Sequence, residues 1–344
     1  MHFLTVHGFL NPGDLSLETL VPQGSHPFGC VEKLQEGVRA MGLPLDLIQL
    51  EAGRLSGELL PLQVGPLQLL RLRADRGLHG RGSKPLGRQV VALDLEPWRH
   101  QQPLVAHGVR LPSDSLFGLA PSGGIHLSTG GSCSLAILTI ERQTFLRWAT
   151  DLGCPELDGA AFDRNWFAIY PHLQEGLRAY LRQLFAVAER QPARLLGSHR
   201  WSRLVAEDLV PLVVEALASL AGQANRSQRP IARIELVKAT QRWMDEHPME
   251  PITLDALCRR VHAGRRSLIQ GFREHLGMGP MAYLKRQRLH GARRVLLAAD
   301  PAQTCVASVA GEFGFLNAGH FAIAYRELFG ERPSITLQGG RRPV

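Results

Sequence analysis

The sequence predicts a multidomain α+β protein, and three observations lead to that prediction. The chain has 344 residues, more than one typical domain needs. Glycine and proline crowd into the first 160 residues among short β-rich runs, whereas apolar residues spaced three or four apart dominate the remainder. The excess of positive charge lies almost entirely in the last third of the chain.

Residues 44–140 have the pattern of short strands separated by turns. The most β-rich runs are residues 68–73, 89–95 and 134–140, and glycines and prolines punctuate the sequence between them. Regular spacing of this kind predicts a sandwich or a small barrel. Periodicity alone does not decide between the two.

Amphipathic helices are predicted in residues 141–222, because leucines recur there at helical spacing. Pro211 is expected to divide the second of these helices or to begin a new one. Residues 223–230 are polar, poor in apolar residues and closed by a proline, which predicts a linker.

Charge and composition exclude several classes of protein. From residue 231 onward the chain has 17 Lys and Arg against 10 Asp and Glu, so this third has a charge of +7 out of a total of +8, as expected for a part that meets a polyanion. No apolar run is long enough for a membrane span, no secretory signal is evident, and the five cysteines have no metal-finger spacing. We therefore expect a cytoplasmic protein with no membrane partner, no metal, no cofactor and no catalytic residues.

The last third begins with a helix marked by Ile234 and Met244 and ended by prolines. Thr253 can then cap a short helix over residues 254–261. A glycine-containing turn follows, and a basic helix is predicted over residues 265–275. A short helix, a tight turn and a basic second helix are the parts of a helix-turn-helix.

The same unit is predicted a second time. Thr304 can cap another short helix, Phe313-Gly314-Phe315 forms a turn, and a helix follows over residues 317–329. Between the two units a long helix is predicted over residues 280–299. The basic residues of that connector fall on the face opposite its apolar residues: Lys285, Arg286, Arg288, Arg293 and Arg294. A rigid connector that separates the units by about 34 Å would place both in successive major grooves.

Residues 231–338 resemble the DNA-binding domain of the AraC/XylS-type transcriptional regulators, and the similarity extends over both units and the connector. The matching residues are Thr253-Leu254, Leu257-Cys258, Arg266-Ser267-Leu268, Phe272, Gly277-Met278-Gly279-Pro280, Tyr283-Leu284, Arg288-Leu289, Val309-Ala310, Phe313-Gly314-Phe315, His320-Phe321, Tyr325 and Phe329-Gly330 with Pro333-Ser334. One helix-turn-helix match is weak evidence, whereas two at this separation with a matching connector are specific.

The resemblance also implies which side chains contact DNA. In the first unit it places Arg266, Ile269 and Gln270 against base edges, where arginine pairs with guanine and glutamine with adenine. Arg265 and Arg273, at the flanks of the helix, are implied as phosphate contacts that set the register.

The second unit departs from the family pattern. Asn317, His320 and Ile323 match its base-reading positions, but the family often has a hydrogen-bonding side chain where Ile323 stands. Ile323 can offer only apolar contact to a thymine methyl group. Our hypothesis is that the first unit supplies most of the base specificity, while the second docks on the DNA backbone through Arg326.

For the remainder, the resemblance implies a cupin-like β-barrel with flanking helices that senses a small effector and forms a homodimer. The expected divisions are an N-terminal extension at 1–30, a sensing and dimerisation domain at 31–222, the linker, the DNA-binding domain at 231–338 and a basic tail at 339–344. Partners would be double-stranded DNA, an unidentified effector and, for an activator, RNA polymerase. The alternatives are a ligand-independent DNA-binding adaptor and a cupin-type enzyme fused to a DNA-binding domain; no legible metal or acid–base set supports the enzyme.

Overall fold

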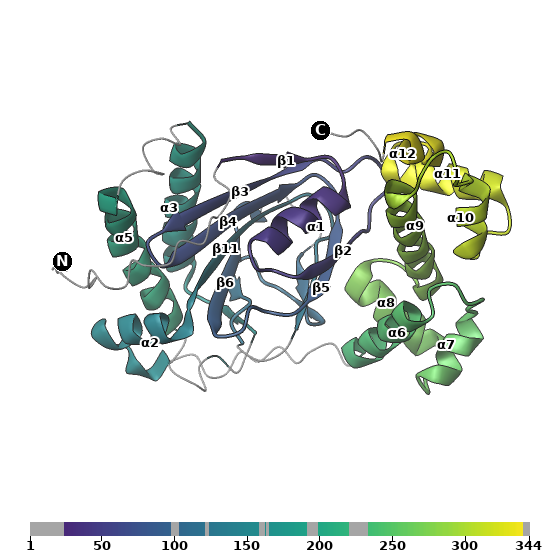
Figure 1. The fold of residues 1–344 in the computed structure, drawn as a ribbon. Coiled ribbons are helices and arrows are strands. Elements are labelled where there is room, and N and C mark those ends of the chain that lie inside the picture. Colours follow the sequence, from purple (N-terminus) through teal and green to yellow (C-terminus); the bar gives the residue numbers. More distant parts are fainter. Residues whose placement is uncertain are drawn as a thin grey trace.

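A β-rich domain is followed by an all-helical one in the computed structural model (Figure 1). The structure describes residues 24–97, 103–120, 124–157, 162, 165–190, 199–219 and 233–339. The expected linker at 223–230 lies outside the described residues, as do residues 1–23 of the expected extension and 340–344 of the expected tail. The predicted α+β class and its order, strands first and helices last, are confirmed.

Two antiparallel sheets make up the β domain. The larger sheet contains, in spatial order, β1 (His26–Phe28), β3 (Gly57–Val64), β4 (Leu67–Ala74), β11 (Cys133–Glu141), β6 (Arg88–Asp94), β9 (Ser115–Phe117) and β12 (Trp166–Ala168). The smaller contains β2 (Leu45–Gln49), β5 (Leu78–Gly82), β10 (Ile125–Ser128), β7 (Val105–Ala106) and β8 (Val109–Arg110). The three predicted strand runs are β4, β6 and β11. The sheets pack face to face and are not joined into a closed barrel.

Both faces of the larger sheet are buried. Successive side chains of a strand point to opposite faces of the sheet, so alternate residues of one strand belong to different apolar clusters. On β11, Leu135 lies between the two sheets, whereas Ala136 and Leu138 face outward. The outward face is covered by helices (Figure 1). These helices are α2 (Arg142–Asp151), α3 (Pro171–Arg190) and α5 (His199–Ala218), with a short 3-10 turn at Pro155–Leu157.

Pro211 does not divide a helix: α5 continues through it, so that prediction was wrong. A proline inside a helix removes one hydrogen bond and crowds the preceding turn. Here Leu209, Val213 and Val214 are buried on either side of it in the core shared with the sheet, and this tertiary packing offsets the local cost.

The N-terminal boundary of the β domain also differs from the expected residue 31. Strand β1 already pairs with β3, with His26 opposite Leu59, so the described part of the domain begins before α1 (Val31–Ala40). Helix α1 buries Leu34 and Val38 in the apolar cluster between the sheets. The extension can therefore comprise at most the residues before this strand.

The helical domain contains the two predicted helix-turn-helix units. Its helices are α6 (Ile234–Glu246), α7 (Leu254–Arg260), α8 (Arg265–Leu276), α9 (Pro280–Ala298), α10 (Val306–Glu312), α11 (Ala318–Phe329) and α12 (Pro333–Gly339). Helices α7 and α8 form the first unit, α10 and α11 the second, and each unit has its own apolar core. The units lie at opposite ends of α9 (Figure 1).

The two units repeat the same local geometry. In each, the turn between the helices has one residue at positive φ, His262 in the first and Gly314 in the second. In each, the second helix ends on a left-handed glycine, Gly277 or Gly330, which is the residue least strained there. Pro280 and Pro333 then begin the next helix, a position that suits proline.

The predicted caps have different outcomes. The hydroxyl of Thr253 accepts a hydrogen bond from the Ala256 amide at 3.1 Å, as expected. Thr304 does not cap α10: the N-cap is Cys305, whose side chain makes no capping hydrogen bond.

Among the described helices none is long and apolar enough to cross a membrane, and the described residues contain no cluster of three or more His, Cys, Asp or Glu arranged for a metal ion.

We expect Gly291→Ala to destabilise the protein, although alanine is ordinarily the better helix residue by about 1 kcal/mol. A Cβ at Gly291 on α9 would overlap the buried ring of Phe313, and such overpacking costs about 1–3 kcal/mol. Gly176→Ala is the matched control, because a Cβ there on α3 meets no atom within 4 Å. Urea unfolding should show lower stability for the first variant and unchanged or higher stability for the second; equal gains in both would contradict this packing.

Candidate nucleic-acid interface

The predicted reading face of α8 is open to solvent. Arg265, Arg266, Gln270 and Arg273 are exposed and Ile269 is half-buried. The opposite face of the helix buries Leu268 and Phe272 in the core of the first unit. The amphipathic pattern of α8 therefore presents its polar side chains as one surface.

Two of these side chains have partners within the unit. Arg265 forms a bidentate ion pair with Asp255 at 2.5 and 2.6 Å, which lowers the pKa of that carboxyl. Gln270 donates to Glu274 at 2.9 Å. No described residue forms an ion pair with Arg266 or Arg273. The charges of Arg266 and Arg273 are therefore available to an anion, whereas that of Arg265 is partly offset.

The second reading helix is less polar. The side chain of Asn317 accepts the His320 amide at 2.9 Å and so caps α11, which leaves its NH₂ group as the available donor. His320 and Arg326 are exposed, and Ile323 is 52% exposed. Sequence reasoning missed Leu316, which is fully exposed just before the helix. The sequence signal that could have identified Leu316 is that it is an apolar residue in the predicted turn, outside the apolar spacing of the helix that follows.

The basic face of the connector is not free to meet DNA as a whole. Lys285 and Arg294 are exposed, but Arg286 donates to the Leu50 carbonyl at 2.6 Å and Arg288 donates to the Glu250 carbonyl. Arg293 is buried and pairs with carboxylates on both sides, as described next. The expectation that all five basic residues lie opposite the apolar face was therefore wrong for Arg293, whose guanidinium lies over the ring of Phe329 at 4.7 Å, and the helical spacing gave no sign that the β domain contacts Arg286.

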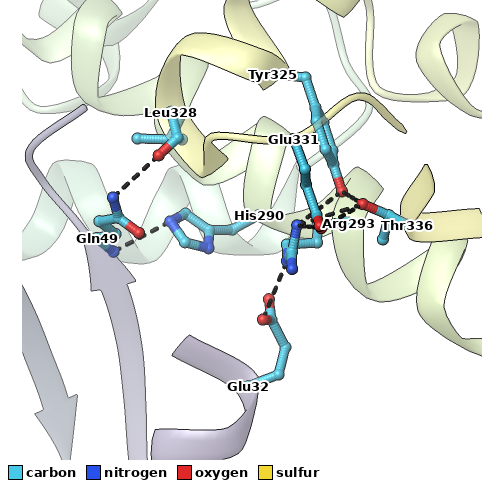
Figure 2. A network of polar contacts seen from close by, with 8 residues as sticks. All are labelled: Glu32, Gln49, His290, Arg293, Tyr325, Leu328, Glu331 and Thr336. Atoms are coloured by element: carbon cyan, nitrogen blue, oxygen red, sulfur yellow. Dashed lines mark hydrogen bonds and ion pairs between the residues drawn. The ribbon is translucent and has the colours of Figure 1, made fainter. Parts of the chain in front are cut away.

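Figure 2 shows how the β domain holds the second unit. Arg293 of α9 lies 3.1 Å from Glu32 of α1 and 2.6 Å from Glu331, beside α12. Nearby, Gln49 at the end of β2 donates its amide N–H to Nε2 of His290 at 3.0 Å and its side-chain NH₂ to the Leu328 carbonyl at 3.0 Å. The β domain therefore contacts both the connector and the end of the second reading helix.

The first unit is held through a second set of contacts. Gln241 of α6 bridges two buried histidines of the smaller sheet, His79 at 3.1 Å and His126 at 3.0 Å. Arg81 of the same sheet forms an ion pair with Asp245 of α6 at 2.6 Å. Neither contact was predicted, because residues more than 100 positions apart in the sequence meet only in the folded chain.

A family model described as a helix-turn-helix domain matches residues 257–339. The probable thc operon regulatory protein of Rhodococcus erythropolis is 39% identical over 103 residues, 30% of this chain and 31% of that protein. The transcriptional activator RhaS of Escherichia coli is 25% identical over 199 residues, 58% of this chain and 66% of that protein. The chain thus covers less than two thirds of the length of these relatives.

Solved structures are also similar to part of the chain. A probable AraC family transcriptional regulator from Rhodopseudomonas palustris is 38% identical and covers 31% of this chain and 99% of its own, with a TM-score of 0.29. The DNA-binding domain of AdpA, solved in complex with a target DNA, is 28% identical and covers 30% of this chain and 89% of its own, with a TM-score of 0.28.

We expect acid to destabilise the folded chain through histidines that are buried where the two domains meet. Burial lowers the pKa of His126 to about 4 and of His290 to about 3, from an ordinary 6.5. The unfolded chain therefore takes up these protons near pH 6.5 while the folded chain does not, so stability is complete above that pH and falls as the pH drops toward 4.

Urea unfolding between pH 7.5 and 4.5 measures this, at up to about 1.4 kcal/mol per pH unit for each such histidine. His290→Gln is the informative variant, since glutamine can still accept from the Gln49 amide and does not titrate. Its unfolding free energy should depend less on pH than that of the native chain; an equal slope would show that His290 is not neutral in the fold.

Proposed function

We propose that the chain is a helix-turn-helix regulator of the AraC/XylS type, which binds double-stranded DNA in a sequence-specific way and regulates transcription. The observation that carries the proposal is the pair of exposed reading helices, α8 and α11, fixed at opposite ends of the one helix α9. This is the arrangement in which two helices can enter successive major grooves of one duplex.

The two units would contribute unequally to the discrimination between bases. Exposed Arg266 and Gln270 on α8 are side chains that recognise base edges in the major groove. In the second unit, Leu316 just before α11 and Ile323 on it are exposed apolar side chains, which suit contact with thymine methyl groups, while Arg326 suits a phosphate. The first unit would therefore supply most of the discrimination.

The β domain would make this binding responsive to a small effector. It contacts both units directly, through Gln241 and Asp245 in the first and Leu328 in the second, so a change in the β domain can alter how the units are presented. This favours an effector-responsive regulator over a ligand-independent adaptor. In this scheme residues 24–219 are the sensing domain and residues 233–338 the DNA-binding domain.

Other parts of the proposal follow from the relatives. RhaS and the XylDLEGF operon regulator of Pseudomonas putida are named transcriptional activators, so activation through RNA polymerase is the proposed mode. A homodimer in the cytoplasm, without enzymatic activity, completes the proposal.

Arg266→Ala should relax base preference, because it removes a bidentate contact worth about 1–3 kcal/mol of discrimination. Arg326→Ala should instead weaken binding to all sequences by a similar factor, because a phosphate contact carries no base information. Selection from random duplexes gives the preferred site, and titration of each single-base variant gives the profile. The reverse pattern in the two variants would refute the unequal division.

Asp255→Asn should strengthen DNA binding and steepen its dependence on salt. The substitution removes the carboxylate that pairs with Arg265, so one more cation can neutralise a phosphate and the logarithmic salt slope should grow by about 1. Glu246→Gln makes the same change in net charge at an exposed position of α6 away from the reading face. Equal effects of both substitutions, measured by fluorescence anisotropy from 50 to 300 mM salt, would count against a specific role for Arg265.

A further inference from the structure

A cleft of about 740 Å³ lies where the β domain meets the end of α8. One wall comes from the β domain and includes Arg110 of β8 and the segment after β2. The other wall comes from the helical domain and includes residues 273–278 and Arg286 of α9. The cleft therefore belongs to both domains, and its volume is in the range of small-molecule sites.

The cleft carries an excess of positive charge. Four arginines line it against two glutamates. No described residue forms an ion pair with three of these arginines, Arg110, Arg273 and Arg286. Of the glutamates, Glu274 is 3.2 Å from Arg233, and Glu51 accepts the Gly77 amide at 2.8 Å. The carboxylates are thus engaged elsewhere, whereas the three arginines have no carboxylate partner among the described residues; Arg286 donates only its Nε–H, to the Leu50 carbonyl.

His275 adds a buried polar group to the cleft. Its side chain lines the cleft and is only 2% exposed, yet neither Nδ1 nor Nε2 has a hydrogen-bond partner among the described residues. Leaving such a group unpaired costs about 1–3 kcal/mol. Burial lowers the pKa of His275, so the ring is neutral and offers one N–H to an acceptor.

Apolar side chains complete the lining. Val105 and Met278 are half-buried, and Leu276 is buried beside them. By contrast, the space between the two sheets, where a barrel would hold its ligand, is filled by leucine, phenylalanine and valine side chains packed as one cluster. The cleft thus offers cations, a hydrogen-bond donor and an apolar wall together.

We infer that this cleft binds a small organic acid, with its carboxylate paired to Arg286 and Arg110 and its apolar part against Val105 and Met278. An arginine–carboxylate contact is charge-assisted and strong for its size. The inference rests on the proposed function in treating the ligand as the effector of the regulator. It places that ligand between the domains, against the helix that reads DNA.

Calorimetric titration of the full chain, without DNA, tests the site with three probes. Hexanoate carries both the charge and the apolar body, 1-hexanol only the body, and inorganic phosphate only the charge. Hexanoate should bind saturably at one site, and the other two should bind at least about ten-fold more weakly. Absence of saturable hexanoate binding, or equal binding of 1-hexanol, would overturn the inference.

Two variants locate the binding. Arg110→Gln and Arg286→Gln should each weaken hexanoate binding about five-fold, the effect of losing one accessible ion pair. Arg39→Gln on α1 makes the same change in charge at an exposed position outside the cleft and should bind like the native chain. Native affinity in both cleft variants would overturn the assignment, even if hexanoate binds elsewhere.

The two proposals fail separately in this design. Hexanoate titration needs no DNA, and selection of a duplex by the native chain needs no hexanoate. If the native chain binds hexanoate at the cleft but selects no DNA sequence, the ligand site is supported and the proposed regulatory function is refuted. If it selects a DNA sequence but does not bind hexanoate, only the ligand site is refuted.

Discussion

The docking of α9 onto the end of β2 is the contact on which the rest of the arrangement depends. Gln49 is almost completely buried, and it supplies an amide to His290 while its side chain donates to the Leu328, Glu51 and Gly53 carbonyls. A buried polar group of this kind is tolerable only when fully paired, because each lost partner leaves an unsatisfied donor or acceptor. The contact is therefore specific: a shifted register between the domains would break several hydrogen bonds together.

That specificity gives the β domain its influence over both reading helices. The carbonyls that meet the β domain belong to the last turn of α11, Glu327 to Gly53 and Leu328 to Gln49, so the second unit is held at the end opposite its N-terminal reading residues. The first unit is held through α6 and borders the cleft through the last turn of α8. The second reading helix is thus held at its C-terminal end, the first is held through α6, and both have their reading faces exposed.

Local sequence determined what could be predicted. Thr253 as a cap and Gly314 in a turn have signatures that depend on neighbours within a few residues, and the helix bounds in the last third agree within about two residues. The prediction for Pro211 was wrong because buried packing around α5 offsets the local cost of a proline. The prediction for Thr304 was wrong because α10 begins one residue later, with Cys305 as its N-cap. The reading residues came from the family pattern, whereas Leu316, the bridging Gln241 and the cleft depend on long-range contacts that no periodicity records.

The charge of the last third needs the same correction. Counting its 17 Lys and Arg treats every cation as available to DNA, but Arg233 pairs with Glu274, Arg265 with Asp255, and Arg293 with Glu32 and Glu331. Arg293 is also buried, so it stabilises the fold and the docking instead of attracting a polyanion. The counterions released on binding come only from phosphates met by exposed, unengaged cations. The folded domain therefore presents a smaller positive surface than its composition predicts, and Arg266 and Arg273 of α8 are among the exposed cations that remain for a phosphate.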